Sequence, residues 1–175
     1  MEQPGLWSRE GRTAAVSELF VVHHRRLVGL AALLVDDRQS AEEVVQDAFL
    51  ALYRRWRVLR DPASAVAYLN RCVVNGGRDR LRRGRRYAVL APRLTPTVLT
   101  LDSTELTAVA HDESEHLHGA LRELPGRQRE VLVLRYYLDQ TEAEIAETLG
   151  ISRGSVKTHA SRGLAALARR LDEES

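Results

Sequence analysis

The sequence predicts an all-α protein of two small helical domains, joined by a flexible linker. Apolar residues recur at helical spacing over residues 14–86, and the same period returns over residues 114–171. Between them, residues 87–113 contain prolines, frequent threonine and an acidic excess, a composition typical of a linker. Residues 141–162 predict two helices joined by a tight turn.

Composition restricts the class of protein. The chain has 175 residues, of which 44% are hydrophobic and 29% charged, as in ordinary globular proteins. Its net charge of +2 hides a basic excess in residues 1–90, which indicates an anionic partner, nucleic acid before membrane. The single cysteine, Cys72, excludes a disulfide framework and a cysteine-based zinc site. No apolar run approaches the ~20 residues of a membrane span, and the first residues do not form a signal peptide, so we expect a soluble cytoplasmic protein.

Residues 14–35 predict a first long helix, which Asp36 and Asp37 end. Ser40 and Glu43 have the spacing of a capping box and predict the start of a second helix there. The outer side of this second helix carries Gln46, Asp47, Leu50 and Arg54. An apolar side chain among polar ones indicates either a docking surface or a solvated face with one stray leucine, and both interpretations stay open. The neighbouring His23 and His24 point in different directions on a helix, so we expect no metal site.

A third helix, predicted from about residue 65 to residue 83, carries two parallel stripes. One stripe is apolar. The other stripe consists of Tyr68, Arg71, Asn75, Arg78 and Arg82. Aromatic stacking combined with cationic contacts to the backbone is how proteins hold single-stranded nucleic acid. A solvated basic helix face is the alternative, but it does not explain the aligned tyrosine and asparagine.

The stretch after residue 140 predicts a helix-turn-helix. Thr141 and Glu144 form a capping box, Gly150 ends the helix, and Ser152 can cap the next one. The second helix has an apolar stripe, and away from it lie Lys157, Thr158, Ser161 and Arg162. In a helix-turn-helix the second helix enters the major groove of duplex DNA. The alternative is an ordinary helical hairpin with a solvated basic face.

Three stretches of the chain resemble the extracytoplasmic-function (ECF) group of bacterial RNA polymerase sigma factors, most closely its actinobacterial SigE-like branch. They are AEEVVQDAFLALYRRW at 41–56, AYLNRCVVNGGRDRLRR at 67–83 and LPGRQREVLVLRYYLDQTEAEIAETLGISRGSVKTHASRGLAAL at 124–167. The resemblance covers about residues 14–86 and 114–171.

The resemblance implies a division of labour. Residues 14–86 would be the sigma-2 domain, which docks on the polymerase clamp and captures the melted −10 element. Residues 114–171 would be the sigma-4 domain, which reads the −35 element as duplex, and linker 87–113 would run through the polymerase. The implied partners are core RNA polymerase, through its clamp and flap regions, and promoter DNA, with an anti-sigma protein as a further candidate. No cofactor, metal or catalytic residue is implied, because the polymerase carries the chemistry.

The resemblance also assigns roles to residues. Lys157 and Arg162 would contact base edges or phosphates, and Arg153, Ser155 and Thr158 the DNA backbone. The stripe that begins at Tyr68 and ends at Arg82 would hold an unpaired base, with the loop 59–64 forming part of the pocket. The residues that would meet the clamp are Gln46, Asp47, Leu50 and Arg54. Two departures matter: Tyr68 stands where many members have tryptophan, and Ser161 where some carry a larger side chain, so base preference does not transfer.

Two other classes of protein compete with this interpretation. A polymerase-independent helix-turn-helix regulator would need a sensing or dimerising half, whereas residues 14–86 offer chemistry that suits nucleic acid. A DNA-processing enzyme would need a metal or nucleophile constellation, and the sequence shows none.

Overall fold

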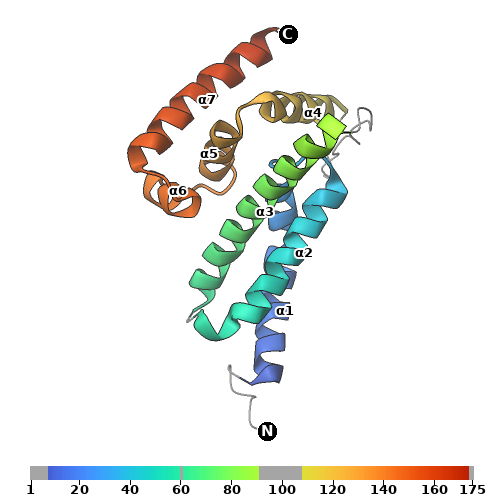
Figure 1. The fold of residues 1–175 in the computed structure, drawn as a ribbon, viewed down its shortest axis with the longest axis vertical. Helices are drawn as coiled ribbons and strands as arrows, with labels where there is room; N and C mark the ends of the chain where they lie inside the picture. Colours follow the sequence, from blue (N-terminus) through green and yellow to red (C-terminus); the bar gives the residue numbers. More distant parts are fainter. Residues whose placement is uncertain (1–7, 60, 91–107, 174–175) are drawn as a thin grey trace.

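The computed structural model describes residues 8–59, 61–90 and 108–173, and the regular structure of these residues is helical throughout (Figure 1). This confirms the predicted all-α class. The first half contains α1 (Arg9–Ala32), α2 (Arg38–Arg55), a short 3₁₀ helix (Trp56–Val58) and α3 (Pro62–Leu90). The second half contains α4 (Ala108–Glu123), α5 (Gly126–Tyr136), α6 (Glu142–Leu149) and α7 (Arg153–Glu173).

The first three long helices form a bundle in which α2 packs against both α1 and α3. Leucine and valine side chains from all three helices fill its centre and are fully buried, among them Leu27, Val45, Leu52, Leu69 and Val73. Burying one such side chain stabilises the fold by about 1.5–3 kcal/mol. The polar faces of α2 and α3 are therefore held in place by a packed apolar core.

The capping box predicted at Ser40 and Glu43 is wrong. Asp37 is the N-cap of α2: its carboxylate accepts hydrogen bonds from the Ser40 amide at 2.8 Å and from the Ser40 hydroxyl at 2.6 Å. A carboxylate three residues ahead satisfies the free amide, so the helix begins earlier than predicted. Glu43 is instead free to form an ion pair with Arg80 on α3.

The third helix also begins earlier and ends later than predicted. Asp61 accepts a hydrogen bond from the Ser64 amide at 2.8 Å, and Pro62 occupies the first helical turn, where its missing N–H costs nothing. Within the predicted pocket loop 59–64, Asp61 therefore caps α3, and residues 62–64 form its first turn. Helix α3 continues to Leu90 and α4 starts at Ala108, so both reach into the predicted linker, whose remaining residues lie outside the described ranges.

The helix-turn-helix is confirmed in detail. The Thr141 hydroxyl accepts from the Glu144 amide at 3.3 Å, and the Glu144 carboxylate accepts from the Thr141 amide at 2.7 Å. Gly150 closes α6 with φ of 64°, a left-handed conformation that glycine adopts without steric cost. Ser152 then accepts from the Ser155 amide at the start of α7.

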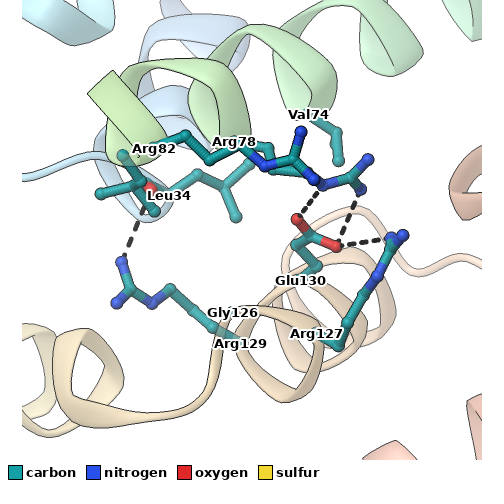
Figure 2. Close-up of a pocket in the computed structure, with 9 residues that line it drawn as sticks. Leu34, Val74, Arg78, Arg82, Gly126, Arg127, Arg129 and Glu130 are labelled. Carbon is teal, nitrogen blue, oxygen red and sulfur yellow. Dashed lines mark hydrogen bonds and ion pairs between the residues drawn. The ribbon is translucent and has the colours of Figure 1, made fainter. Parts of the chain in front are cut away.

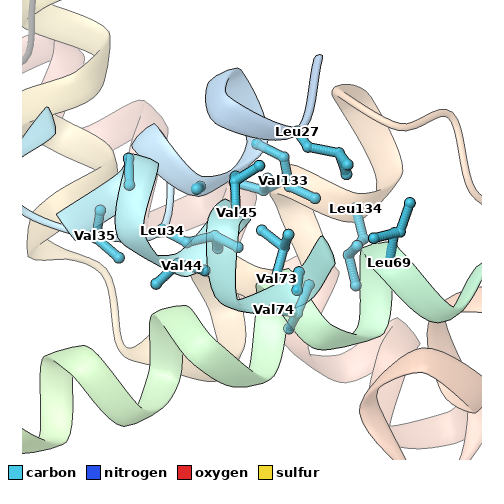
Figure 3. Close-up of a cluster of buried hydrophobic side chains, with 14 of the residues drawn as sticks. Leu27, Leu34, Val35, Val44, Val45, Leu69, Val73, Val74, Val133 and Leu134 are labelled. Carbon is cyan, nitrogen blue, oxygen red and sulfur yellow. The ribbon is translucent and has the colours of Figure 1, made fainter. Parts of the chain in front are cut away.

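The two halves share a hydrophobic core, which the sequence did not predict. A single cluster of buried side chains runs from Leu27 and Leu69 in the bundle to Val133 and Leu134 on α5 (Figure 3). Helix α5 is buried on all sides at its VLVL segment, residues 131–134, because α7 covers one side and the bundle the other. None of the described helices is long and apolar enough to cross a membrane.

Candidate nucleic-acid interface

Helix α7 presents a polar and cationic face opposite its buried stripe. Val156 and Ala160 are buried against α5 and α6, and Gly163 lies so close to Leu132 that a Cβ there would come within 3.1 Å of its side chain. The residues predicted to bind duplex DNA lie on the other side. Exposed are Arg153, Lys157, Thr158, Ser161 and Arg162, and Ser155 is half-buried at the first turn.

This face has the chemistry that a major groove requires. Arginine and lysine can bind guanine edges or phosphates, while short hydroxyl side chains allow the helix to approach the groove. The hydroxyl of Thr158 donates to the Gly154 carbonyl at 3.0 Å, and the Lys157 ammonium lies 3.8 Å from the carboxylate of Glu142. Because Lys157 and Thr158 are exposed, DNA can replace these contacts at small cost.

Five of the predicted site residues lie along α3, and we call them the α3 stripe: Tyr68, Arg71, Asn75, Arg78 and Arg82. Arg71, Asn75 and Arg82 are exposed, and Tyr68 and Arg78 are half-buried. The stripe thus combines an aromatic ring, an amide and guanidinium groups along one helix. The residue roles themselves remain predictions.

Tyr68 both packs on the bundle and keeps part of its ring accessible. It is partly buried against the hydrophobic core, and the Arg55 guanidinium lies 5.9 Å from its ring centroid. Burial and a hydrogen bond with Cys72 raise the pKa of the Tyr68 phenol. The ring is therefore neutral near pH 7 and suited to stacking on a base.

Two arginines of the stripe form ion pairs with the second half of the chain, and Figure 2 shows the pair formed by Arg78. Arg78 donates two hydrogen bonds to the carboxylate of Glu130 on α5, at 2.8 and 2.9 Å, and Arg127 donates a third at 3.0 Å. Arg71 pairs with Glu147 on α6 at 3.3 Å. The side chain of Glu130 is only 8% exposed, and its hydrogen bond raises the pKa of Arg78. The charged guanidinium of Arg78 therefore meets the Glu130 carboxylate in a contact from which most solvent is excluded.

Next to this contact lies a basic pocket of about 260 Å³, between α3 and α5. Arg78, Arg82, Arg127 and Arg129 line it together with the single carboxylate of Glu130. Arg129 is 2% exposed, and it donates to the backbone carbonyls of Leu34 and Arg122. Arg129 therefore connects α5 to the turn that follows α1 and to the end of α4.

The predicted docking face on α2 is exposed. Gln46, Asp47, Leu50 and Arg54 all reach solvent, and 53% of Leu50 is accessible. Asp47 and Asn75 line one groove between α2 and α3, together with Ala48 and Ala51. The docking face and the α3 stripe therefore meet at the edge of the bundle.

Sequence reasoning missed Glu130, Glu147 and Arg129. The one available signal was the RQRE segment, residues 127–130, which puts charged residues directly before an uninterrupted apolar run. Among the described residues, no group of three or more His, Cys, Asp or Glu side chains is arranged to hold a metal ion.

Comparison with known proteins decides the family. Residues 19–87 match the model for sigma-70 region 2, and residues 114–167 match that for sigma-70 region 4. The chain is 33% identical over 161 residues to the ECF RNA polymerase sigma factor SigM of Mycobacterium tuberculosis, covering 92% of this chain and 79% of the relative. The chain belongs to the ECF sigma factors. It is also 31% identical to the RNA polymerase sigma-E factor of Streptomyces antibioticus, over 93% of this chain and 88% of that protein.

Two solved structures have the same fold as this chain. The sigma factor RpoE of Bartonella quintana, solved in complex with the anti-sigma factor NepR, superimposes with a TM-score of 0.72 over 89% of this chain and 95% of its own, at 21% identity. CnrH, solved with the cytosolic domain of CnrY, gives a TM-score of 0.69 over 95% of this chain and 93% of its own, at 24% identity. As an ECF sigma factor, the chain directs promoter-specific transcription.

Proposed function

We propose that this sigma factor reads a promoter in two physically different ways, through two helices on different halves of the chain. Residues 14–86 form the sigma-2 domain, residues 87–113 the linker and residues 114–171 the sigma-4 domain. The observation that supports this proposal is the pairing of a helix-turn-helix with the α3 stripe, which suits an unpaired strand. A protein that bound only duplex would need the first face and not the second.

In the sigma-4 domain, α7 would enter the major groove at the −35 element. Lys157 and Arg162 lie on its exposed face, where they can reach base edges, while Arg153 and Ser155 lie at its first turn, where they can reach the flanking phosphates. Phosphate contacts set the position of the helix and base contacts set the sequence. Thr158 and Ser161 have short side chains that keep the helix close to the groove.

In the sigma-2 domain, the α3 stripe would hold the melted −10 element. Tyr68 and Asn75 are seven residues apart, about 10.5 Å along the helix, so they can engage neighbouring parts of one strand. Tyr68 would stack on a base, Asn75 would hydrogen-bond a base edge, and Arg71, Arg78 and Arg82 would follow the phosphates. Paired DNA hides base faces in the stack, so these contacts favour the open complex.

Core RNA polymerase is the partner that makes these contacts productive. The exposed face with Gln46, Asp47, Leu50 and Arg54 would dock on the clamp, and the sigma-4 domain would meet the flap. The chain itself would perform no catalytic step, and it would act in the cytoplasm with the polymerase. One structural neighbour, RpoE, was solved with the anti-sigma factor NepR, and the other, CnrH, with the cytosolic domain of CnrY. An anti-sigma protein is therefore a further expected partner.

Reconstituted transcription tests this proposal. The full chain is added to core polymerase on a library of genomic fragments, and the 5′ ends of the transcripts are mapped. We expect start sites that appear only with the chain and share upstream elements near −10 and −35. A chain that binds duplex DNA in a shift assay, yet creates no start site, would instead be a polymerase-independent regulator.

A further inference from the structure

The pocket between α3 and α5 is lined by more positive than negative charge (Figure 2). Arg78 and Arg82 reach it from α3, and Arg127 reaches it from α5. One lining carboxylate, that of Glu130, accompanies these three guanidinium groups, so three positive charges and one negative charge leave a net charge of +2. Like charges held close together at partly buried positions repel one another, and a bound anion would relieve that repulsion.

The Glu130 carboxylate is already engaged and does not use up this excess of positive charge. Its Oε1 atom accepts a hydrogen bond from Arg78, and its Oε2 atom accepts from Arg78 and from Arg127. Arg82 follows one turn after Arg78 on α3 and is exposed, so its guanidinium can turn toward a ligand. The pocket therefore offers Arg82 as a donor beside two guanidinium groups that are already held in place.

Arg129 and the start of α5 add positive potential to the pocket at fixed positions. Arg129 lines the pocket and donates to the backbone carbonyls of Leu34 and Arg122, which hold its guanidinium in one orientation. Gly126, the first residue of α5, also lines the pocket, and no side chain caps this end of the helix. The N-terminus of a helix carries a partial positive charge. Because these groups are fixed before a ligand arrives, little binding free energy is lost in ordering them.

We propose that this pocket binds a phosphate group, either free or carried by a small organic molecule. A phosphate monoester has a charge of about −1.5 to −2 near pH 7, which matches the net charge of +2. Arginine suits phosphate because its planar guanidinium donates two parallel hydrogen bonds. The pocket volume of about 260 Å³ is several times the ~30 Å³ of one water molecule, and Leu34, Val74 and Leu81 also line it. An organic phosphate can therefore place its carbon skeleton against these apolar side chains.

Titration calorimetry on the full-length chain tests the site without DNA or polymerase. The probes are phenyl phosphate, inorganic phosphate and phenyl sulfate, which has the shape of phenyl phosphate but a smaller negative charge. We expect saturable binding of both phosphates and weaker binding of the sulfate. Arg82→Gln, and separately Arg127→Gln, should lower the affinity for phosphate at least about tenfold, a difference of ~1.4 kcal/mol. The matched control is Arg83→Gln, which changes an exposed neighbour that lines a different groove and should bind like the parent.

The two phosphate probes distinguish the sources of the group. Tighter binding of phenyl phosphate than of inorganic phosphate would assign the site to an organic phosphate, and equal or weaker binding would assign it to free phosphate. The proposal would be overturned by a parent without saturable binding, by equal affinities for phenyl sulfate and phenyl phosphate, or by the same loss in Arg83→Gln as in Arg82→Gln.

A melting curve for each variant shows whether it is folded. Arg82 is exposed, so Arg82→Gln keeps the test decisive even if Arg127→Gln is destabilised by the loss of its hydrogen bond to Glu130. Because no promoter enters the calorimetry, failure of reconstituted transcription would count against the proposed function alone.

Discussion

The hydroxyl of Tyr137, the C-cap residue of α5, donates a hydrogen bond of 3.0 Å to the backbone carbonyl of Arg26 on α1, and its ring lies against Gly29. A Cβ at Gly29 would overlap the Tyr137 hydroxyl, so only glycine allows this approach. Burial raises the pKa of Tyr137, which keeps the phenol protonated as the donor. The contact joins the two halves at a point separate from the Arg78–Glu130 ion pair.

We therefore expect Gly29→Ala to loosen the contact between the halves. Alanine favours a helix over glycine by about 1 kcal/mol, so α1 itself should not suffer, but Tyr137 must leave the Arg26 carbonyl. Dipolar distances between labels on α1 and α5 should broaden. Gly119→Ala on α4 is the matched control, since a Cβ there meets no atom within 4 Å. Identical distance distributions in the two variants would contradict the role given to this contact.

Leu50→Glu should weaken binding to core polymerase while leaving the fold intact. More than half of the Leu50 side chain is exposed, so its change costs the free protein little, but a docked apolar surface would lose the leucine and bury a charge. We expect at least a tenfold loss of affinity, ~1.4 kcal/mol, in a pull-down or titration with core enzyme. Val21→Glu, at an apolar position 83% exposed on α1, is the control. Unchanged holoenzyme formation by Leu50→Glu would remove α2 from the docking surface.

Changing Arg162 to alanine and changing Arg153 to alanine should have different effects on DNA binding. If Arg162 makes a bidentate base contact, its loss costs about 1–3 kcal/mol at one base pair and relaxes preference there. Arg153, at the first turn of α7, should lower affinity evenly across sequences and reduce the slope of affinity with salt. A series of −35 base substitutions, measured at two salt concentrations, separates the two effects. The same profile for both variants would refute this division of roles.

The cap of α3 predicts part of the acid sensitivity of the fold. Hydrogen bonds from Ser64 lower the pKa of Asp61 below its usual value near 4. A carboxylate with a lowered folded-state pKa contributes stability that is complete above the unfolded value and is lost as pH falls through the folded value. Asp61→Asn keeps a capping oxygen but cannot titrate. Its melting temperature should therefore fall less than that of the wild type below pH 4, with Asp172→Asn as control, and equal acid sensitivity would contradict the assignment.

Local patterns explain why the helices and the helix-turn-helix were predictable. The capping contacts of Thr141, Glu144 and Gly150 join residues that are only three or four positions apart, so the sequence spacing alone predicts their geometry. The start of α2 was missed because Asp37 and Ser40 both offer a capping oxygen three residues before a polar residue, and only the backbone shows which one is used.

The contact between the halves could not be predicted in the same way. Arg78 and Glu130 are 52 residues apart, and their meeting depends on how α5 lies across the bundle. The VLVL run at 131–134 does carry a signal: a short helix that is apolar on every side must be covered on every side. The exposed face of α7 was predictable because its buried stripe defines the opposite side, whereas partial occupation of the α3 stripe was not.

Variants of Tyr68 and Asn75 distinguish capture of the unpaired strand by α3 from a purely structural role of these two residues. Tyr68 is half-buried, so Tyr68→Ala should lose both packing and stacking, worth roughly 1–3 kcal/mol per base, whereas Tyr68→Phe should keep most of both. Asn75 is exposed, so Asn75→Ala should leave the melting temperature unchanged. Recruitment to a closed promoter should stay near wild type in each case, because paired DNA offers neither contact. On a template with a pre-melted −10 bubble the defect should shrink only in part.

Permanganate footprinting of the −10 thymines is the most direct measurement. It is made on reconstituted complexes at a mapped promoter, beside a melting curve for each protein. We predict that Asn75→Ala, folded as stably as the wild type, and Tyr68→Ala both give clearly reduced thymine reactivity, while Tyr68→Phe stays close to the wild type. Wild-type reactivity in folded Asn75→Ala and Tyr68→Ala would contradict strand capture by these two residues.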